Sequence, residues 1–101
     1  MYVRTLEGQL GKADRQEAIN YVRESIAPAL RRQPGFVSAR LWSNPASGHS
    51  QLALVWESEQ DRQRADADGF LQTLLSHLAQ YYVAPPVCQH YEINVQIVSL
   101  R

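Results

Sequence analysis

The chain of 101 residues carries ten Lys plus Arg against ten Asp plus Glu, so its formal net charge is zero, and 45% of its residues are hydrophobic. A chain of this size forms one domain, which we expect to span residues 1–101, and its small core would gain from a partner subunit. No basic run is longer than Arg31–Arg32. This excludes the electrostatic footprint of a protein that binds nucleic acid or an acidic membrane surface.

The sequence also indicates where the protein is located and whether it depends on a disulfide or a structural metal. Residues 1–4 contain no apolar signal-peptide core, and no stretch approaches the roughly 18 to 20 apolar residues of a membrane span, so we expect a soluble, cytoplasmic protein. Cys88 is the single cysteine and cannot form an internal disulfide, and no Cys/His cluster has zinc spacing. We therefore expect neither a disulfide nor a structural metal.

Residues 1–8 predict a strand, because β-branched and aromatic residues are frequent there and glycines follow. A helix is predicted from Asp14, a residue type common at N-caps, to Pro34–Gly35, which ends it. Its apolar residues recur at helical spacing and share one face: Ala18, Ile19, Val22, Ile26, Ala29 and Leu30. Pro28 lacks a backbone donor and clashes with the preceding turn, so we expect a kink there.

Residues 35–44 and 50–57 predict an antiparallel hairpin around the polar turn 44–48. Alternation in the first of these strands predicts one face with Phe36, Ser38, Arg40 and Trp42 and another with Val37, Ala39 and Leu41. The second strand is apolar on both faces over residues 51–56. Strands of this kind are usually covered on both sides, so we expect something to cover the second face of the sheet.

Two helical stretches are predicted next. Ser58 and Asp61 match a capping box that opens a polar stretch, which Gly69 interrupts. A second stretch begins at Phe70 and ends before the turn 84–86. It places five residues on one apolar face: Leu71, Leu74, Leu75, Leu78 and Tyr82.

Residues 87–98 alternate apolar and polar side chains and predict the last strand. The order is therefore β-α-β-β-α-β, the ferredoxin-like α+β arrangement in which a four-stranded antiparallel sheet carries helices on one face. The other face is bare within one chain although the middle strands are apolar on both sides. We therefore predict a homodimer in which two sheets pack through their open faces.

Two short motifs resemble those of a known family. Gln-Pro-Gly-Phe at residues 33–36 leads into the second strand, and Leu-Val-Trp-Glu-Ser at residues 54–58 leaves the third strand for a helix. With the order of elements, they resemble the antibiotic biosynthesis monooxygenase-like proteins of the dimeric α+β barrel superfamily, over nearly the whole chain. The resemblance implies a small pocket between helices and sheet in each subunit, which would take a small hydrophobic or aromatic ligand.

The resemblance also implies which side chains would act. In relatives that oxidise aromatic polyketides these are Asn, Trp and Tyr, and in haem-degrading relatives they are Asn, Trp and a helical His that binds iron. Here the first strand offers Thr5 and Glu7 without an Asn, and the helix after Ser58 contains no Trp. A His common early in that helix in quinol-oxidising relatives is replaced by residues 62–66, Arg-Gln-Arg-Ala-Asp. His77 roughly matches the position of the haem-binding His.

Three residues are candidates for catalysis: His77, His90 and Arg40. His77 lies on the flank of the last helix, where it would bind haem, act as a general base, or simply be solvated. His90 shares the polar face of the last strand with Glu92, which would orient it for proton transfer or form a polar ladder at the dimer rim. Arg40 would hold a carboxylate or phenolate oxygen, or pair across the dimer with Glu57 or Glu92.

Four aromatic residues are candidates for substrate binding: Trp42, Trp56, Phe70 and Tyr81. The tryptophans would stack on a flat aromatic ligand or fill the core, and we favour the core for Trp56. Tyr81 would line a pocket mouth or pack beside the double-proline turn. We expect Cys88 to be a buried, inert thiol.

The sequence thus favours a cofactor-independent monooxygenase-like protein that acts on a small aromatic or quinol-type substrate, with His77 or His90 as base and Arg40 as anion clamp. A non-catalytic dimeric barrel that binds a small molecule or a protein partner is the first alternative. A haem-binding or haem-degrading protein, with His77 as ligand, is the second. No cofactor is expected for the first two functions.

Overall fold

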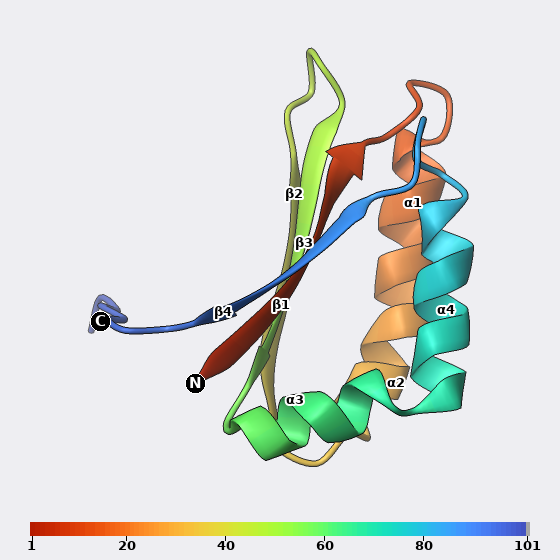
Figure 1. Cartoon of the computed structure of the whole chain (residues 1–101). Coiled ribbons are helices and arrows are strands. Elements are labelled where there is room, and N and C mark those ends of the chain that lie inside the picture. Colours follow the sequence, from red (N-terminus) through yellow and green to blue (C-terminus); the bar gives the residue numbers. More distant parts are fainter. Residues whose placement is uncertain (101) are drawn as a thin grey trace.

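A computed structural model describes residues 1–100, which form one four-stranded antiparallel sheet with helices packed on one face (Figure 1). The strands are β1 (Tyr2–Gln9), β2 (Phe36–Ser43), β3 (His49–Trp56) and β4 (Val87–Glu92), in the order β2-β3-β1-β4. The helical elements are α1 (Arg15–Tyr21), η1 (Val22–Ile26), α2 (Ala27–Arg31), α3 (Glu59–Asp66) and α4 (Gly69–Ala79). The predicted ferredoxin-like α+β fold is confirmed.

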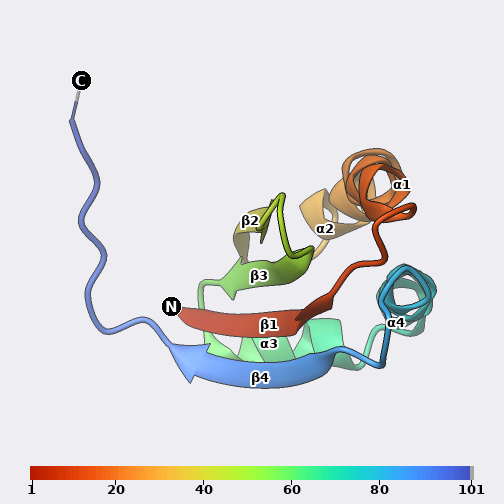
Figure 2. The same cartoon turned by 90° about the horizontal axis from the view of Figure 1, so that it is seen from above.

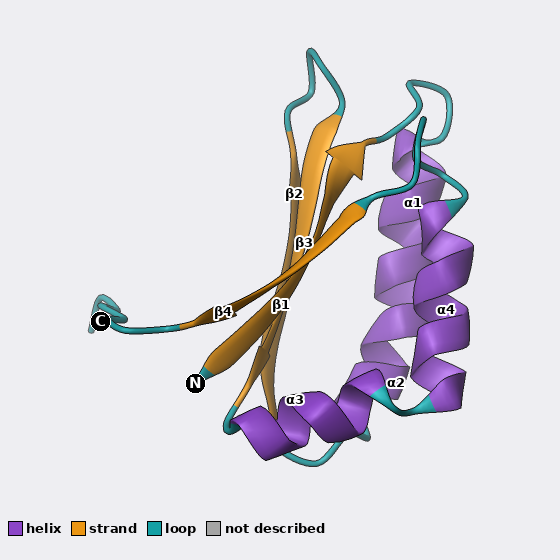
Figure 3. Ribbon diagram, in the orientation of Figure 1, coloured by secondary structure: helices purple, strands orange, loops and turns teal. Residues whose placement is uncertain are grey.

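The layers are clearest when the sheet is viewed end on. The helix from α1 to α2 lies over β2 and β3, and α4 lies beside it on the same side (Figure 2). The short α3 closes the end of the sheet near the N-terminus (Figure 3). Among residues 1–100, no helix is both long enough and apolar enough to cross a lipid bilayer.

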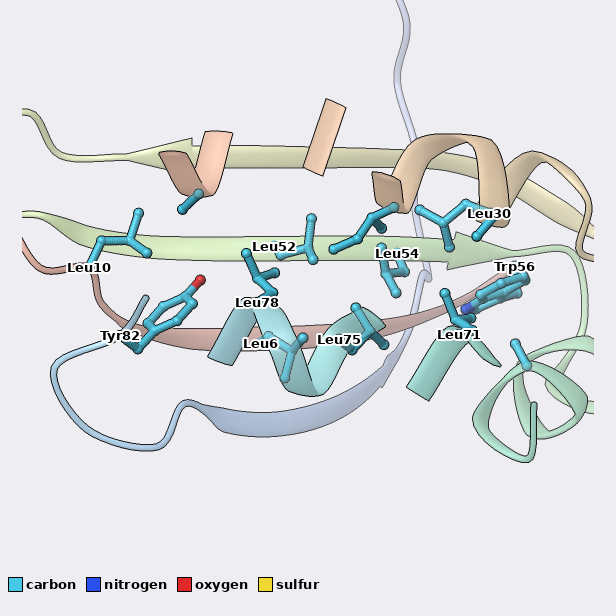
Figure 4. Packing of buried hydrophobic residues seen from close by; sticks show 14 residues of the cluster. Leu6, Leu10, Leu30, Leu52, Leu54, Trp56, Leu71, Leu75, Leu78 and Tyr82 are labelled. Atoms are coloured by element: carbon cyan, nitrogen blue, oxygen red, sulfur yellow. The ribbon is translucent and has the colours of Figure 1, made fainter. Parts of the chain in front are cut away.

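The core lies between the sheet and these helices (Figure 4). Alternate residues of β3, namely Leu52, Leu54 and Trp56, point into it and are almost fully buried. They meet Leu71, Leu75 and Leu78, which α4 contributes at helical spacing. Tyr82 closes one end, and its hydroxyl lies 3.4 Å from the Ser50 hydroxyl. Burial raises the pKa of Tyr82, and the hydrogen bond to Ser50 partly offsets this.

The first helix contains a wide turn directly before Pro28, the residue at which a kink is expected. The Ala27 N–H donates to the Val22 carbonyl five residues earlier, so η1 is a π-helical turn. Pro28 follows in the first turn of α2, where a missing backbone donor is tolerated. Asp14 does occupy the N-cap, but its side chain makes no capping hydrogen bond.

A β-bulge changes the predicted faces of β2. Phe36 pairs with Trp56 and Ser38 pairs with Val55, which follow one another in β3. Val37 is therefore the extra residue of the bulge and has no partner in β3. Phe36 therefore lies on the helix side, where its ring meets Trp56 edge-on at 5.5 Å between centroids. The prediction that Phe36 shares a face with Ser38 is wrong, because alternation holds only where the pairing is regular.

Caps define the two later helices. The Ser58 hydroxyl accepts a hydrogen bond from the Asp61 N–H at 3.1 Å, which confirms the predicted capping box. The Asp68 carboxylate accepts from the Leu71 N–H at 2.8 Å and starts α4, so Gly69 is the first residue of that helix rather than a break. The Leu71 N–H, together with the Gln33 side chain, holds the pKa of Asp68 below its usual value.

The last strand is shorter than predicted. It ends at Glu92, which pairs with Tyr2, and the Ile93 N–H makes one further bond to the Met1 carbonyl. Beyond this point β1 offers nothing to pair with, so the alternating residues 93–98 have no strand partner within residues 1–100. They leave the sheet on the side away from the helices (Figure 2).

No helix covers the sheet face opposite α1 and α4, although residues 96–99 line a cavity of about 430 Å³ together with residues of β2 and β3 on this face. This face carries Val3 and Thr5 of β1, paired with Val55 and Ala53 of β3. Three of these four are only partly buried, whereas Thr5 is 5% exposed and its hydroxyl has no hydrogen-bond partner among residues 1–100.

Candidate functional site

A polar cluster lies where α3 meets β1 and β4. The register pairs Arg4 with His90 and Leu6 with Cys88. Because alternate residues of a strand share a face, Arg4, His90 and Cys88 all lie on the helix side of the sheet, next to α3. Cys88 is exposed there, which corrects the expectation of a buried thiol, since β4 is the edge strand of the sheet.

Asp66, the last residue of α3, is the centre of this cluster. Its carboxylate accepts from Arg4 Nη1 at 3.2 Å and from Arg62 Nη1 at 2.8 Å. It also lies 3.2 Å from His90 Nε2. In the tautomer that carries its proton on Nε2, His90 donates to Asp66 and keeps Nδ1 free to accept a proton. The side chain of His90 is 45% exposed, so a ligand can reach it.

Arg4 connects this cluster to a cavity. Its side chain is 14% exposed, and its guanidinium also donates to the Gln72 side-chain carbonyl at 2.9 Å and to Cys88 Sγ at 3.2 Å. The cavity has a volume of about 260 Å³ and lies between β1 and α4, with Arg4 as its one charged lining residue. The other lining residues include Leu6, Leu75 and Pro85. A guanidinium in a largely apolar cavity is suited to an aromatic anion. We call this the β1–α4 cavity.

The three predicted catalytic residues lie on three different surfaces. His90 joins the Asp66 cluster, although it does not line the β1–α4 cavity. Arg40 is exposed on the second sheet face and, in the part of the chain that the structure describes, makes no ion pair with Glu57 or Glu92. His77 is exposed on the outer side of α4.

The surroundings of His77 are aromatic. Its ring lies 4.6 Å from that of Tyr21 and 5.6 Å from that of Tyr81, between centroids, and its Nε2 is 3.4 Å from the Tyr81 hydroxyl. Partial burial raises the pKa of Tyr21, and Tyr81 adds to the effect. This setting does not fit an axial ligand of a haem held between helices and sheet, because His77 lines neither the β1–α4 cavity nor the cavity between the first helix and β2.

The predicted substrate-binding residues are also dispersed. Trp56 is 1% exposed in the core, as we favoured, although its indole N–H has no partner among residues 1–100. Trp42 is 50% exposed at the β2 edge and Phe70 is 62% exposed in the first turn of α4. Tyr81 packs in the aromatic group around His77. Their roles in binding stay predictions.

Sequence reasoning missed Arg4, Asp66 and Gln72. The signal for Arg4 was present, because a charged residue two positions before Leu6 falls on the core side of a predicted strand. Asp66 gave no such signal, since an acid in a polar helix is ordinarily solvated. Among residues 1–100, no group of three or more His, Cys, Asp or Glu is arranged to hold a metal ion.

Comparison with known proteins identifies the fold. No protein-family model matches the sequence, and a search of curated proteins finds no match. A monooxygenase from the gene ActVA-Orf6 of Streptomyces coelicolor, solved in complex with the ligand nanaomycin D, has a TM-score of 0.81 at 20% identity over 98% of this chain and 92% of the other.

Two further solved structures are similar. A candidate antibiotic biosynthesis monooxygenase from Deinococcus radiodurans has a TM-score of 0.77 at 15% identity and covers 100% of both chains. One from Nitrosomonas europaea has a TM-score of 0.76 at 14% identity, over 94% of this chain and 100% of the other. At these identities the likeness shows the fold, which is the one that the resemblance to antibiotic biosynthesis monooxygenases predicted.

Proposed function

We propose that the protein is a cofactor-independent monooxygenase-like enzyme that oxidises a small aromatic or quinol-type substrate in the β1–α4 cavity. The observation that carries this proposal is the guanidinium of Arg4, which lines this largely apolar cavity and shares the Asp66 carboxylate with His90. The fold adds support, because proteins with the same fold are described as antibiotic biosynthesis monooxygenases and one is solved with nanaomycin D.

The cavity would bind a phenolic ring through its apolar lining and a phenolate oxygen through Arg4. Its volume of about 260 Å³ is below the roughly 300 Å³ at which cavities for drug-sized ligands begin, which favours a single ring. His90 lies outside the cavity lining, so it would accept the proton on Nδ1 from a phenol whose hydroxyl extends past Arg4 to the Asp66 cluster, where Asp66 orients the imidazole through Nε2. Arg4 would stabilise the resulting anion in a partly dry site.

The anion is the species that reacts with dioxygen. For a hydroquinone, one oxygen atom becomes a new hydroxyl on the ring carbon and the other leaves as water, so the product is the hydroxyquinone. The substrate supplies all four electrons that reduce dioxygen, and the balance requires no reductant. The residues named here would bind the ring, take its proton and hold the charge.

The test is oxygen uptake with a hydroquinone as substrate. We expect catalysed uptake by the unaltered protein and a loss of 10²- to 10⁴-fold in His90→Gln, as for removal of a general base. Arg4→Gln should lose activity as well, with circular dichroism used to check its fold. His49→Gln is the matched control, because His49 lies at the far end of β3 and pairs with Glu7.

Each outcome of this test is informative. If His77→Gln loses oxygen uptake and His90→Gln does not, His77 is the general base and our assignment of His90 is wrong. The unaltered protein could also show no catalysed oxygen uptake but bind a phenolate saturably, with binding abolished in Arg4→Gln. That result would show a non-catalytic binding protein and contradict the proposed enzyme.

We also infer that two copies pair through the open sheet face. Helices α1, α2 and α4 lie on the other side of the sheet and α3 lies at its end, and on the open face the Thr5 hydroxyl is buried without a hydrogen-bond partner among residues 1–100. Residues 93–100, beside this face, carry four strongly exposed apolar side chains: Val95, Ile97, Val98 and Leu100. Apolar surface of this extent is typical of a protein–protein contact, and a second copy supplies a face of the same shape.

A further inference from the structure

The guanidinium that lines the β1–α4 cavity has most of its hydrogen-bond donors already in use. An arginine carries five N–H donors in a fixed planar arrangement. The Nε of Arg4 donates to Cys88 Sγ at 3.2 Å. Its Nη1 donates twice, to an Asp66 carboxylate oxygen at 3.2 Å and to the Gln72 side-chain carbonyl at 2.9 Å. Only Nη2 has no partner among residues 1–100.

The three acceptors hold the guanidinium in one orientation because they come from three different elements. Cys88 belongs to β4, Asp66 to α3 and Gln72 to α4. The Gln72 side chain is itself fixed, since its Nε2 donates to the Ala65 carbonyl at 3.1 Å. Arg4 and Gln72 both line the cavity. Nη2 is therefore the nitrogen of this guanidinium that is left for a ligand in the cavity.

The occupied donors limit which anions the guanidinium can bind. The two oxygens of a carboxylate match two parallel N–H groups on one edge of a guanidinium. There are two such edges, one formed by Nε with Nη2 and the other by Nη1 with Nη2. On Arg4, each edge already has one of its nitrogens bonded within the protein. A phenolate has a single oxygen and needs only one N–H, which Nη2 supplies.

We propose that the β1–α4 cavity selects a phenolate over a carboxylate on the same ring, and that Cys88 determines this specificity. The inference rests on the proposed function, because it takes the same cavity as the binding site, and it adds which aromatic anions that cavity rejects. Cys88 is exposed and does not line the cavity, so it acts on a ligand only through Nε of Arg4. It is therefore a positioning residue.

The experiment measures the binding of two matched anions, 4-nitrophenolate and 4-nitrobenzoate, by calorimetry at a pH at which both are ionised. We expect the unaltered protein to bind 4-nitrophenolate at least about 10-fold tighter, since 4-nitrobenzoate must displace one internal hydrogen bond to reach a complete edge. In a ¹H–¹⁵N spectrum, 4-nitrophenolate should shift the amides of Leu75 and Ser76, which line the cavity. Equal affinity for the two anions overturns the proposal, and so does binding that leaves these two amides unshifted.

Cys88→Ala tests the positioning role, with Gln89→Ala as the matched control. Without the sulfur, Nε and Nη2 of Arg4 form a complete edge, so 4-nitrobenzoate should bind about 10-fold tighter while the affinity for 4-nitrophenolate is unchanged. A merely structural role of Cys88 would not tighten binding. Gln89 is the next residue of β4, is exposed and pairs with Thr5 on the other face, so Gln89→Ala should change neither affinity. No gain in Cys88→Ala, or an equal gain in Gln89→Ala, overturns the proposal.

These outcomes are distinct from those of the oxygen-uptake test. A preference for 4-nitrophenolate without catalysed oxygen uptake would contradict the proposed enzyme and support the selection of anions. Catalysed uptake together with equal affinity for the two anions would support the enzyme and contradict the selection.

Discussion

Gly35 joins the first helix to β2 in a left-handed conformation, with φ of +73°, and a Cβ there would overlap the Asp61 carboxylate. We therefore expect Gly35→Ala to reduce the free energy of unfolding by about 2 kcal/mol, from left-handed strain plus steric overlap. Urea denaturation measures this. Gly69→Ala is the control: it meets no atom within 4 Å in the first turn of α4, and we expect no loss or a gain of up to about 1 kcal/mol. Equal losses in both would contradict the steric argument.

At the same scale, single residues show where sequence reasoning reaches its limit in the candidate site. His90 was identified from the sequence because a histidine beside a carboxylate on a strand is suited to proton transfer. Its partner is Asp66 rather than Glu92, and that pairing depends on how α3 meets β4 in space. Arg4 and Asp66 are 62 positions apart, so no local pattern connects them.

The elements α3 and α4 begin at caps that the sequence encodes locally. Ser58→Ala removes the acceptor for the Asp61 N–H, and we expect it to lower the free energy of unfolding by about 1 kcal/mol. Ser76→Ala is the matched control, since Ser76 lies in the middle of α4 and is exposed. Thermal unfolding followed by circular dichroism compares the two. A Ser58→Ala variant as stable as Ser76→Ala would show that the cap contributes little.

Most of the fold could be predicted at this scale because strands and helices carry their own periodicity. The order of elements and the starts of α3 and α4 follow from nearby residues. The bulge at Phe36 and the end of β4 at Glu92 do not, because each depends on which residues the neighbouring strand offers for pairing. The π-helical turn does not follow from nearby residues either, because it depends on which side chains of the first helix pack against the sheet.

For the whole molecule, the open sheet face predicts the oligomeric state. Size-exclusion chromatography with light scattering should return twice the chain mass at micromolar concentration. Val55→Glu places a charge on the open face without a partner and should give the monomer. Val83→Glu, at an exposed valine after α4, should remain a dimer. A clean monomer for the unaltered protein would contradict the pairing.

The π-helical turn also explains how one helix keeps two buried ends. Ala18 and Ile26 are both fully buried and lie eight positions apart. In a regular α-helix, eight residues turn the chain through two full turns and about 80° more, so these side chains would diverge around the axis. The wider turn at residues 22–26 contains one extra residue per turn and reduces this divergence. Deleting a single residue there would leave the two buried side chains seven positions apart, which a regular α-helix brings to within about 20° of the same face. The wide turn therefore accommodates one extra residue in the first helix while Ala18 and Ile26 both stay on the face that meets the sheet.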